Sequence, residues 1–234
     1  MFNADICGHV AAIDNRYHYI QDLFRDYITD KSAEFVLSAS DEAIAAENVN
    51  GNNYSSGYLE SLAIYRCLCE RLVFDDIILF HCSALMCNEK AILFTAPSGT
   101  GKSTHSALWR KVYGNSVKMI NDDKPLIKFG SGITVYGTPY GGKNNIQNNI
   151  SAPVKAIIIL HQSPNNYITK LDSKNAFPRL LSQTYRCSSI EGAERTLRLV
   201  DRLSKLPVYS MGCNISEDAA IMAYNTVFDS LSTT

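Results

Sequence analysis

The sequence has almost no net charge and no long apolar run, and each absence excludes a class of protein. Its 234 residues carry 22 lysines and arginines against 23 aspartates and glutamates, so the formal net charge is −1. A chain this close to neutral lacks the basic surface that nucleic-acid binding requires, and we expect no nucleic-acid partner. No apolar run approaches the ~20 residues that span a bilayer, so we also expect no membrane partner.

Two further patterns are missing, and both bear on the cell compartment. Residues 1–10 lack a basic segment followed by an apolar stretch, which is the pattern of a secretory signal. The seven cysteines are odd in number, and Cys67 and Cys69 are separated by a single residue, which is too close for paired zinc ligands. We therefore expect free, mostly buried thiols in a reducing compartment, and a cytoplasmic protein.

The apolar pattern predicts an α/β fold with a mixed central sheet and flanking helices, because several predicted strands are adjacent in sequence. Residues 1–56 give weak signals, with a strand or short helix over 17–27, and we interpret them as an N-terminal cap or appendage. Residues 57–234 form the main predicted domain. The predicted strands cover residues 34–37, 77–86, 91–95, 117–121, 126–129, 133–136, 155–161, 167–171 and 207–211, and the predicted helices cover residues 58–74, 104–113, 177–185, 190–204 and 217–231.

The strongest motif follows the predicted strand at 91–95. Residues 96–103 match the phosphate-binding pattern G-x-x-x-x-G-K-[ST], with Ala96 in the first position, and a predicted helix follows. Gly99 and Gly101 permit positive φ angles, so that consecutive backbone N–H groups can face one anion. Lys102 supplies a positive charge for phosphates, and Ser103 can place its hydroxyl on Mg²⁺. The sequence therefore predicts an ATP and Mg²⁺ site whose nucleotide-binding residues are Ala96, Pro97, Ser98, Gly99, Thr100, Gly101, Lys102, Ser103 and Thr104.

Two adjacent carboxylates, Asp122 and Asp123, follow the predicted strand at 117–121. Phosphoryl transfer needs a carboxylate on the metal and often a second one that accepts the proton of the attacking hydroxyl. Acidic turns are common, so an Asp-Asp-Lys-Pro turn alone would favour plain turn chemistry. Because the phosphate-binding motif lies upstream, we favour instead a role for the two aspartates in metal binding and proton transfer.

Among the histidines, His81 is our candidate for the site, because it lies on the predicted strand directly before the strand that leads into the motif. A lone histidine in an apolar strand is more often a core residue. His105 is expected either near phosphates or exposed, and His161 is expected to be structural.

These segments together resemble the HPr kinase/phosphorylase-like kinases, a P-loop family grouped with phosphoenolpyruvate carboxykinase. The resemblance rests on His81–Leu85, Ile92–Phe94, Ala96–Thr104 and Asn121–Asp123, in that order. It implies a P-loop kinase fold of the HPr kinase/phosphoenolpyruvate carboxykinase type. It also implies catalytic roles for Asp122, Asp123, Lys102 and His81, and metal binding by Ser103 and Asp123. One of the two aspartates would be the general base.

The chain departs from the family in its later part. HPr kinases carry a signature with glutamate, arginine and closely spaced glycines, and the corresponding stretch here is residues 137–143. This departure weakens two expectations taken from the family: that the substrate is the HPr protein, and that the enzyme also runs the reverse, phosphorylase reaction. Lys143 on that loop either steadies a phosphate or a substrate carboxylate, or is a solvated loop lysine.

The leading functional hypothesis is an ATP- and Mg²⁺-dependent kinase that transfers the γ-phosphate to a hydroxyl of a peptide, a protein or a small molecule. The alternative is a nucleotide-binding regulatory module without transfer chemistry. A carboxykinase-like lyase is a third hypothesis, but the chain is short for it. Relatives of this kind often assemble into oligomers, so the resemblance adds a homo-oligomer to the partners to be tested.

Overall fold

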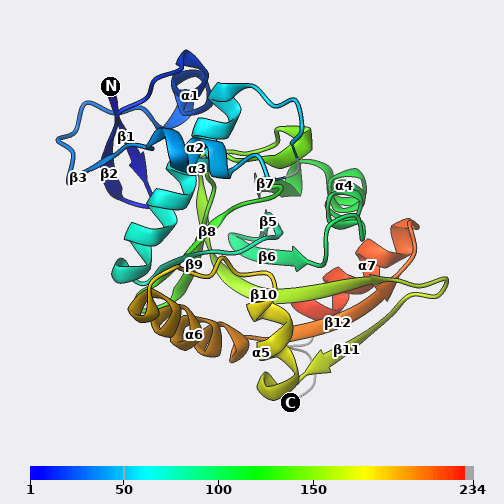
Figure 1. Cartoon of the computed structure of the whole chain (residues 1–234). Helices are drawn as coiled ribbons and strands as arrows, with labels where there is room; N and C mark the ends of the chain where they lie inside the picture. Colours follow the sequence, from blue (N-terminus) through cyan, green and yellow to red (C-terminus); the bar gives the residue numbers. More distant parts are fainter. Residues whose placement is uncertain (50, 230–234) are drawn as a thin grey trace.

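The computed structural model describes residues 1–49 and 51–229, and its strands form two sheets (Figure 1). A small three-stranded sheet has the order β1-β2-β3, with β1 (Phe2–Ile6) antiparallel to β2 (His9–Ile13) and β3 (Phe35–Leu37) parallel to β2. The helices α1 (His18–Leu23) and α2 (Asp41–Ala46) belong to the same N-terminal part of the chain as this sheet.

The large sheet has nine strands and mixes parallel and antiparallel pairs. Its main path is β4-β8-β9-β10-β6-β5-β7, and β12 pairs with both β10 and β11. Residues 151–153 of β10 pair with β9, and its later part lies between β6 and β12. The strand bounds are β4 Ile77–Leu79, β5 Ser83–Cys87, β6 Lys90–Thr95, β7 Val117–Asn121, β8 Leu126–Phe129, β9 Ile133–Tyr136, β10 Ser151–Gln162, β11 Tyr167–Leu171 and β12 Val208–Cys213.

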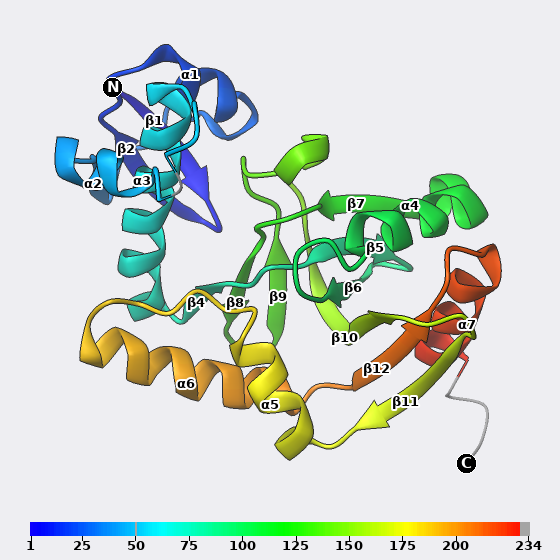
Figure 2. The same ribbon diagram turned by 45° about the vertical axis from the view of Figure 1, so that its right-hand side comes forward.

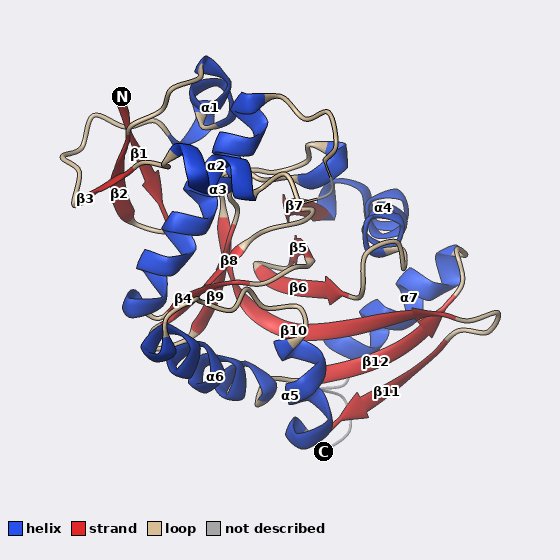
Figure 3. Ribbon diagram, in the orientation of Figure 1, coloured by secondary structure: helices blue, strands red, loops and turns tan. Residues whose placement is uncertain are grey.

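Helices cover both faces of this sheet, which explains the continuous apolar runs in its central strands. Side chains alternate along a strand, so Leu93 packs toward α5 (Ser173–Leu181) and α6 (Ile190–Ser204), and Phe94 packs toward α4 (Lys102–Tyr113) and α7 (Glu217–Phe228). Figure 3 shows the two helix pairs at different sides of the strands. No helix among residues 1–49 and 51–229 is long and apolar enough to cross a bilayer.

The N-terminal elements share an apolar core with α3 (Ser56–Leu72). Phe24 and Tyr27 pack in one cluster with Leu68 of α3 and with Leu126 and Tyr140 of the main part. In Figure 2, α1 and α3 lie on one side of the molecule and α4 lies on the other. The division of the chain at residue 56 stays a prediction.

The predicted mixed α/β architecture is confirmed, and the boundaries over 117–121, 126–129, 133–136 and 190–204 agree with β7, β8, β9 and α6. The single strand predicted over 77–86 is wrong. The chain leaves β4 after Leu79 and begins β5 at Ser83, because the His81 N–H bonds the Gln183 carbonyl and thereby takes the chain out of the ladder. The apolar pattern does not show this break, since residues on both sides of it are buried.

Smaller differences arise where local signals were weak. The ambiguous segment 17–27 contains α1 and a short 3-10 turn. The hairpin of β1 and β2 was not predicted, and its turn places Cys7 at φ 57° and Gly8 at φ 78°. Helix α5 begins at Ser173, capped by Asp172, rather than at residue 177. The predicted end of the last helix at Leu231 lies outside the described residues.

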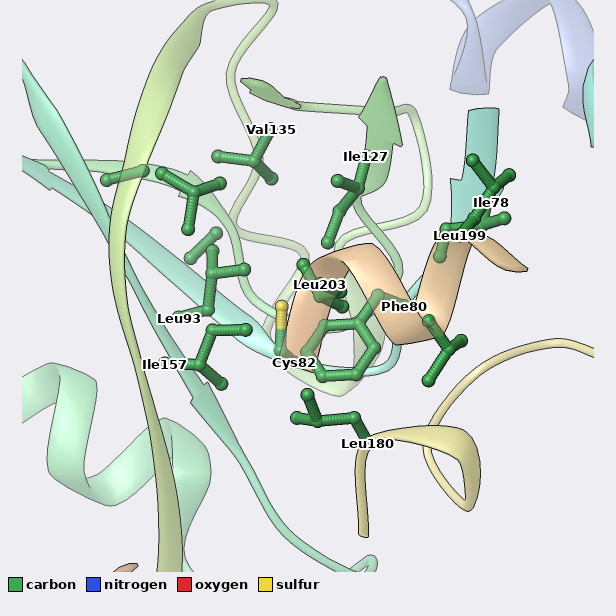
Figure 4. Packing of buried hydrophobic residues seen from close by; sticks show 14 of the residues in the cluster. Ile78, Phe80, Cys82, Leu93, Ile127, Val135, Ile157, Leu180, Leu199 and Leu203 are labelled. Carbon is green, nitrogen blue, oxygen red and sulfur yellow. The ribbon is translucent and has the colours of Figure 1, made fainter. Parts of the chain in front are cut away.

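Replacing Phe80 by alanine is expected to lower the free energy of unfolding by about 3–5 kcal/mol, because the ring is fully buried. Figure 4 shows it among Cys82, Leu180 and Leu203. Urea denaturation measures the loss. The matched control is Phe74→Ala, whose side chain is 38% exposed and which we expect to cost much less. Equal losses in the two variants would contradict this account of the core.

Candidate functional site

A cleft of about 800 Å³ lies where the candidate segments converge. One side of it is the loop after β6 together with the first turn of α4, and the floor carries the aspartate pair that follows β7. The residues that line the cleft are Tyr19, Leu23, Tyr58, Ser61, Leu62, Leu79, His81, Ser98, Gly99, Gly101, Lys102, Ser103, Thr104, Asp122, Asp123, Lys124, Pro139, Tyr140, Gly141, Gly142, Lys143, Asn144 and Asn145. Segments far apart in the sequence therefore meet in one concave site, as ligand sites commonly do.

The 96–103 loop has an open, positive-φ conformation at both of its glycines. Gly99 has φ 82°, and Gly101, the residue before α4, has φ 116°. Apart from the adjacent residues in the chain, no heavy atom of the described residues lies within 4 Å of a Cβ built at either position, so the space over them is free. No described side chain caps the start of α4, which leaves its first backbone N–H groups available to an anion.

Lys102 stands at the start of α4 and is 7% exposed. Its ammonium donates a 2.9 Å hydrogen bond to the Ala96 carbonyl, across the loop. Burial lowers the pKa of Lys102, while the charges of Asp123 and Asp122 act in the opposite direction. A cation held inside the loop and short of anionic partners is a suitable counter-charge for phosphate oxygens.

Asp122 is 5% exposed, and the side chains that bond its carboxylate in the described part of the chain are neutral donors. The Ser83 hydroxyl donates to its Oδ1, as does the Ser106 hydroxyl of α4 at 3.4 Å. The Asn144 amide donates to its Oδ2 at 2.9 Å. These contacts give the carboxylate a defined orientation between β5, α4 and the 137–149 loop.

Asp123 is surrounded by basic side chains instead. Its Oδ1 lies 3.1 Å from Nε2 of His81, and its Oδ2 is in contact with the Lys124 ammonium. Burial raises the pKa of Asp123, but the hydrogen bond from His81 and the charge of Lys124 outweigh burial and lower that pKa to about 2. Asp123 is therefore ionised at any ordinary pH.

Two features of the backbone position the aspartate pair. The Asn121 side-chain oxygen accepts hydrogen bonds from the N–H groups of Asp123 at 2.9 Å and Lys124 at 2.8 Å, which shapes the turn after β7. Gly142, at φ 69°, packs so closely that a Cβ there would lie 2.7 Å from the Asp123 Cβ. The 137–149 loop consequently covers the pair at close range.

The Asp123→Asn substitution is expected to remove a pH-dependent contribution to stability. The pKa of Asp123 is lowered from 3.8 to about 2 in the folded protein, so the carboxylate stabilises the fold above pH 4 and this contribution is lost as the pH falls through 2. The difference in unfolding free energy between wild type and variant should therefore shrink between pH 4 and pH 2. Urea titrations at several pH values measure it, with the exposed Asp30→Asn as control. A difference that stays constant over this range would contradict the pairing with His81 and Lys124.

The predicted site residues are brought together only in part. Lys102, Ser103, Thr104, Asp122, Asp123 and His81 all line the cleft, and so does Lys143, which is exposed. Ser98, Gly99 and Gly101 line it as well, whereas Ala96, Pro97 and Thr100 belong to the loop without lining the cleft. These positions describe geometry, and the roles of the residues stay predictions.

The expectation for His105 was wrong. Its side chain is 2% exposed, does not line the cleft, and packs against Phe94 with ring centroids 4.8 Å apart. The Trp109 indole N–H donates to His105 Nε2 at 3.2 Å, and burial lowers the pKa of His105 to about 4. His161 bonds the Tyr167 hydroxyl at 2.8 Å, as expected of a structural residue.

Sequence reasoning missed several residues that line the cleft or hold its aspartates. Ser83, Ser106 and Asn144 orient Asp122, and Lys124 pairs with Asp123. Lys124 is the only one with a local signal, because it is adjacent to the aspartates in the turn. The residues of α1 and α3 that line the cleft had no local signal of this kind. Those of α1 belong to the segment interpreted as a cap, and those of α3 follow directly after it.

The site fits Mg²⁺ and a nucleotide by the chemistry of its donors. Hydroxyl and carboxylate oxygens of Ser103 and the aspartate pair face the cleft near the open loop. Among residues 1–49 and 51–229, no three His, Cys, Asp or Glu side chains gather into a metal site of their own. Mg²⁺ that is held largely by phosphate oxygens and water needs only one or two protein ligands, so this donor set is adequate for it.

Comparisons with known proteins add a likeness in structure. No protein-family model matches the chain, and no curated protein matches it in sequence. A solved structure of the HPr(Ser) kinase/phosphatase from Coxiella burnetii is similar to it at a TM-score of 0.38 and 12% sequence identity, over 64% of this chain and 88% of that one. The likeness is distant and concerns the arrangement of strands and helices alone.

Proposed function

We propose that the protein is an ATP- and Mg²⁺-dependent kinase that transfers the γ-phosphate to a hydroxyl group. One observation carries the proposal: the open glycine loop with its buried lysine lines the same cleft as two differently held aspartates. Loop amides and a lysine bind phosphate, and carboxylates serve the metal and the hydroxyl proton.

The loop residues bind and orient the phosphates in this proposal. Backbone N–H groups between residues 98 and 103 face the cleft, and the Lys102 ammonium leaves the Ala96 carbonyl for phosphate oxygens. Ser103 and Asp123 would hold Mg²⁺, which would offset the negative charge that builds up on the phosphate oxygens. Asp123 is ionised in the folded protein, since its pKa is lowered to about 2, and a metal there would share its two oxygens with His81 and Lys124.

Asp122 accepts the proton of the acceptor hydroxyl. A carboxylate with a pKa of about 2 is a weak base, which argues against Asp123 in this role. Asp122 has neutral donors on both oxygens, and its Oδ2, which accepts only from Asn144, keeps a free lone pair. The hydroxyl oxygen bonds the γ-phosphorus, the bond from that phosphorus to the β,γ-bridging oxygen breaks, ADP leaves with the electron pair, and the hydroxyl proton passes to Asp122.

Two measurements on the purified protein test the proposal. Calorimetry should detect binding of Mg-ATP, with Mg-GTP titrated in parallel, and γ-labelled ATP should transfer its label to serine-bearing peptides or hydroxyl metabolites. Binding without transfer to any acceptor would favour the regulatory module instead. The absence of any Mg-nucleotide affinity in the folded protein would refute both.

A further inference from the structure

The two sides of the cleft differ in chemistry. All of its lysines and aspartates lie on the loop, the aspartate turn or the 137–149 loop. The opposite side is formed by α1, α3 and the end of β4, and we call it the tyrosine wall; its lining residues are Tyr19, Leu23, Tyr58, Ser61, Leu62 and Leu79. In the part of the chain that the structure describes, this wall presents no Asp, Glu, Lys or Arg to the cleft.

Two hydrogen bonds place the tyrosine wall beyond the aspartate pair as seen from the loop. Ser106 of α4 bonds Asp122, and Asp123 follows in the chain. Next to it, the Lys124 carbonyl accepts a 2.6 Å hydrogen bond from Tyr65 of α3. The order across the cleft is therefore α4, aspartate pair, α3. In-line transfer requires the acceptor oxygen opposite the leaving group, so the group that binds on this wall is the acceptor rather than the nucleotide.

The tyrosine wall is held firmly against the site. The Tyr140 hydroxyl donates to the Ser61 carbonyl at 2.7 Å, and the rings of Tyr65 and Tyr140 stack at 3.9 Å. At Gly57 the chain of α3 comes so close to α1 that a Cβ would lie 2.8 Å from the Tyr19 Cβ. A surface fixed in this way can orient a substrate without first being ordered.

The aromatic surface continues out of the cleft. The rings of Tyr19 and Tyr58 meet edge to face with centroids 6.5 Å apart, and the centroid of Tyr54 lies 5.2 Å from that of Tyr58. Tyr19 is 42% exposed and Tyr54 is 50% exposed. A small acceptor would fill only the interior part, whereas an extended chain can lie along all three rings. Partly exposed tyrosines are typical of surfaces that bind peptides.

From this geometry we propose that the acceptor is a serine- or threonine-containing peptide segment with an apolar or aromatic residue beside the hydroxyl residue. That neighbouring side chain packs on Tyr19 and Tyr58, and the hydroxyl reaches Asp122. The absence of charged groups on the wall excludes recognition by acidic or basic flanking residues. The proposal rests on the kinase function proposed above.

The test uses blocked pentapeptides with a central serine, flanked on both sides by leucine, phenylalanine, glycine, glutamate or lysine. Transfer of label from γ-labelled ATP gives KM and kcat for each peptide, and a nonhydrolysable ATP analogue gives the nucleotide Kd. We expect the leucine and phenylalanine peptides to be the best acceptors. Tyr19→Ala should raise their KM about tenfold, with kcat and nucleotide Kd little changed.

Two further variants separate the wall from its surroundings. Tyr19→Phe retains the ring and should restore the wild-type KM. Tyr17→Ala is the matched control, since Tyr17 is also 42% exposed but does not line the cleft, and it should behave as wild type.

Each other outcome is decisive. A preference for charged flanks, equal use of all five peptides, or transfer to small hydroxyl compounds but to no peptide would overturn the acceptor assignment. A weaker nucleotide Kd in Tyr19→Ala, with an unchanged peptide KM, would assign the wall to the nucleobase. If Mg-ATP does not bind at all, the kinase proposal itself fails, which is a different result from any of these.

Discussion

Replacing Lys102 by alanine is expected to reduce phosphoryl transfer by about a thousandfold and to weaken Mg-ATP binding. The ammonium is buried within the loop, and among residues 1–49 and 51–229 its hydrogen-bond partner is the Ala96 carbonyl, so the phosphate end of the cleft loses its internal cation. No neighbouring cation can replace it, because Lys124 is paired with Asp123 and Lys143 is exposed on another loop. Label transfer under saturating acceptor, together with calorimetry, measures both effects.

The control for this variant is Lys111→Ala on the same helix. Lys111 is 70% exposed in its side chain and pairs with Glu217 of α7, away from the loop. It should leave transfer and nucleotide affinity at wild-type values. If Lys102→Ala binds Mg-ATP as tightly as the wild type and transfers phosphate at the normal rate, the 96–103 loop is not the phosphate site.

Asp122→Asn is expected to abolish transfer while Mg-ATP binding stays close to the wild-type value. Asparagine keeps the size of the side chain but cannot accept the hydroxyl proton, and loss of general-base catalysis costs on the order of 10²–10⁴ in rate. The donors Ser83, Ser106 and Asn144 each have a carboxylate oxygen as partner in the wild type. One of them must face the new amide group, so thermal unfolding should accompany the assay.

The companion variant Asp123→Asn separates the two carboxylates. If Asp123 holds the metal, its loss should raise the Mg²⁺ concentration needed for half-maximal transfer, an effect that Asp122→Asn should not show. Full activity in Asp122→Asn, with inactivity in Asp123→Asn at saturating Mg²⁺, would move the base assignment to Asp123.

The sequence could predict the parts of the site that depend on local backbone chemistry. The loop between β6 and α4 needs glycines at two positive-φ positions, and a lysine next to them, so its pattern is legible in eight consecutive residues. The turn at Asp122 and Asp123 is legible for the same reason. Mixed sheet topology followed from strands that are adjacent in the chain, as β5 and β6 are.

The remaining parts depend on contacts between segments far apart in the sequence. Ser83 and Asn144 reach Asp122 from β5 and from the 137–149 loop, and nothing in their immediate neighbours marks them. The break between β4 and β5 depends on Gln183, about a hundred residues later, which bonds both the backbone and the ring of His81. The tyrosine wall depends on the packing of α1 on α3. The periodicity of residues 1–56 is weak and did not indicate this packing.

The helix after the loop also carries the chain's single tryptophan. Trp109 is fully buried, and its indole N–H is hydrogen-bonded to His105, three residues beyond Lys102. Tryptophan emission from the native protein, excited at wavelengths that tyrosine does not absorb, therefore originates at one point, two turns from the phosphate end of the cleft. A ligand that shifts α4 can be followed through this built-in chromophore without an attached dye, and well above pH 4 the neutral imidazole beside it leaves the signal free of histidine protonation.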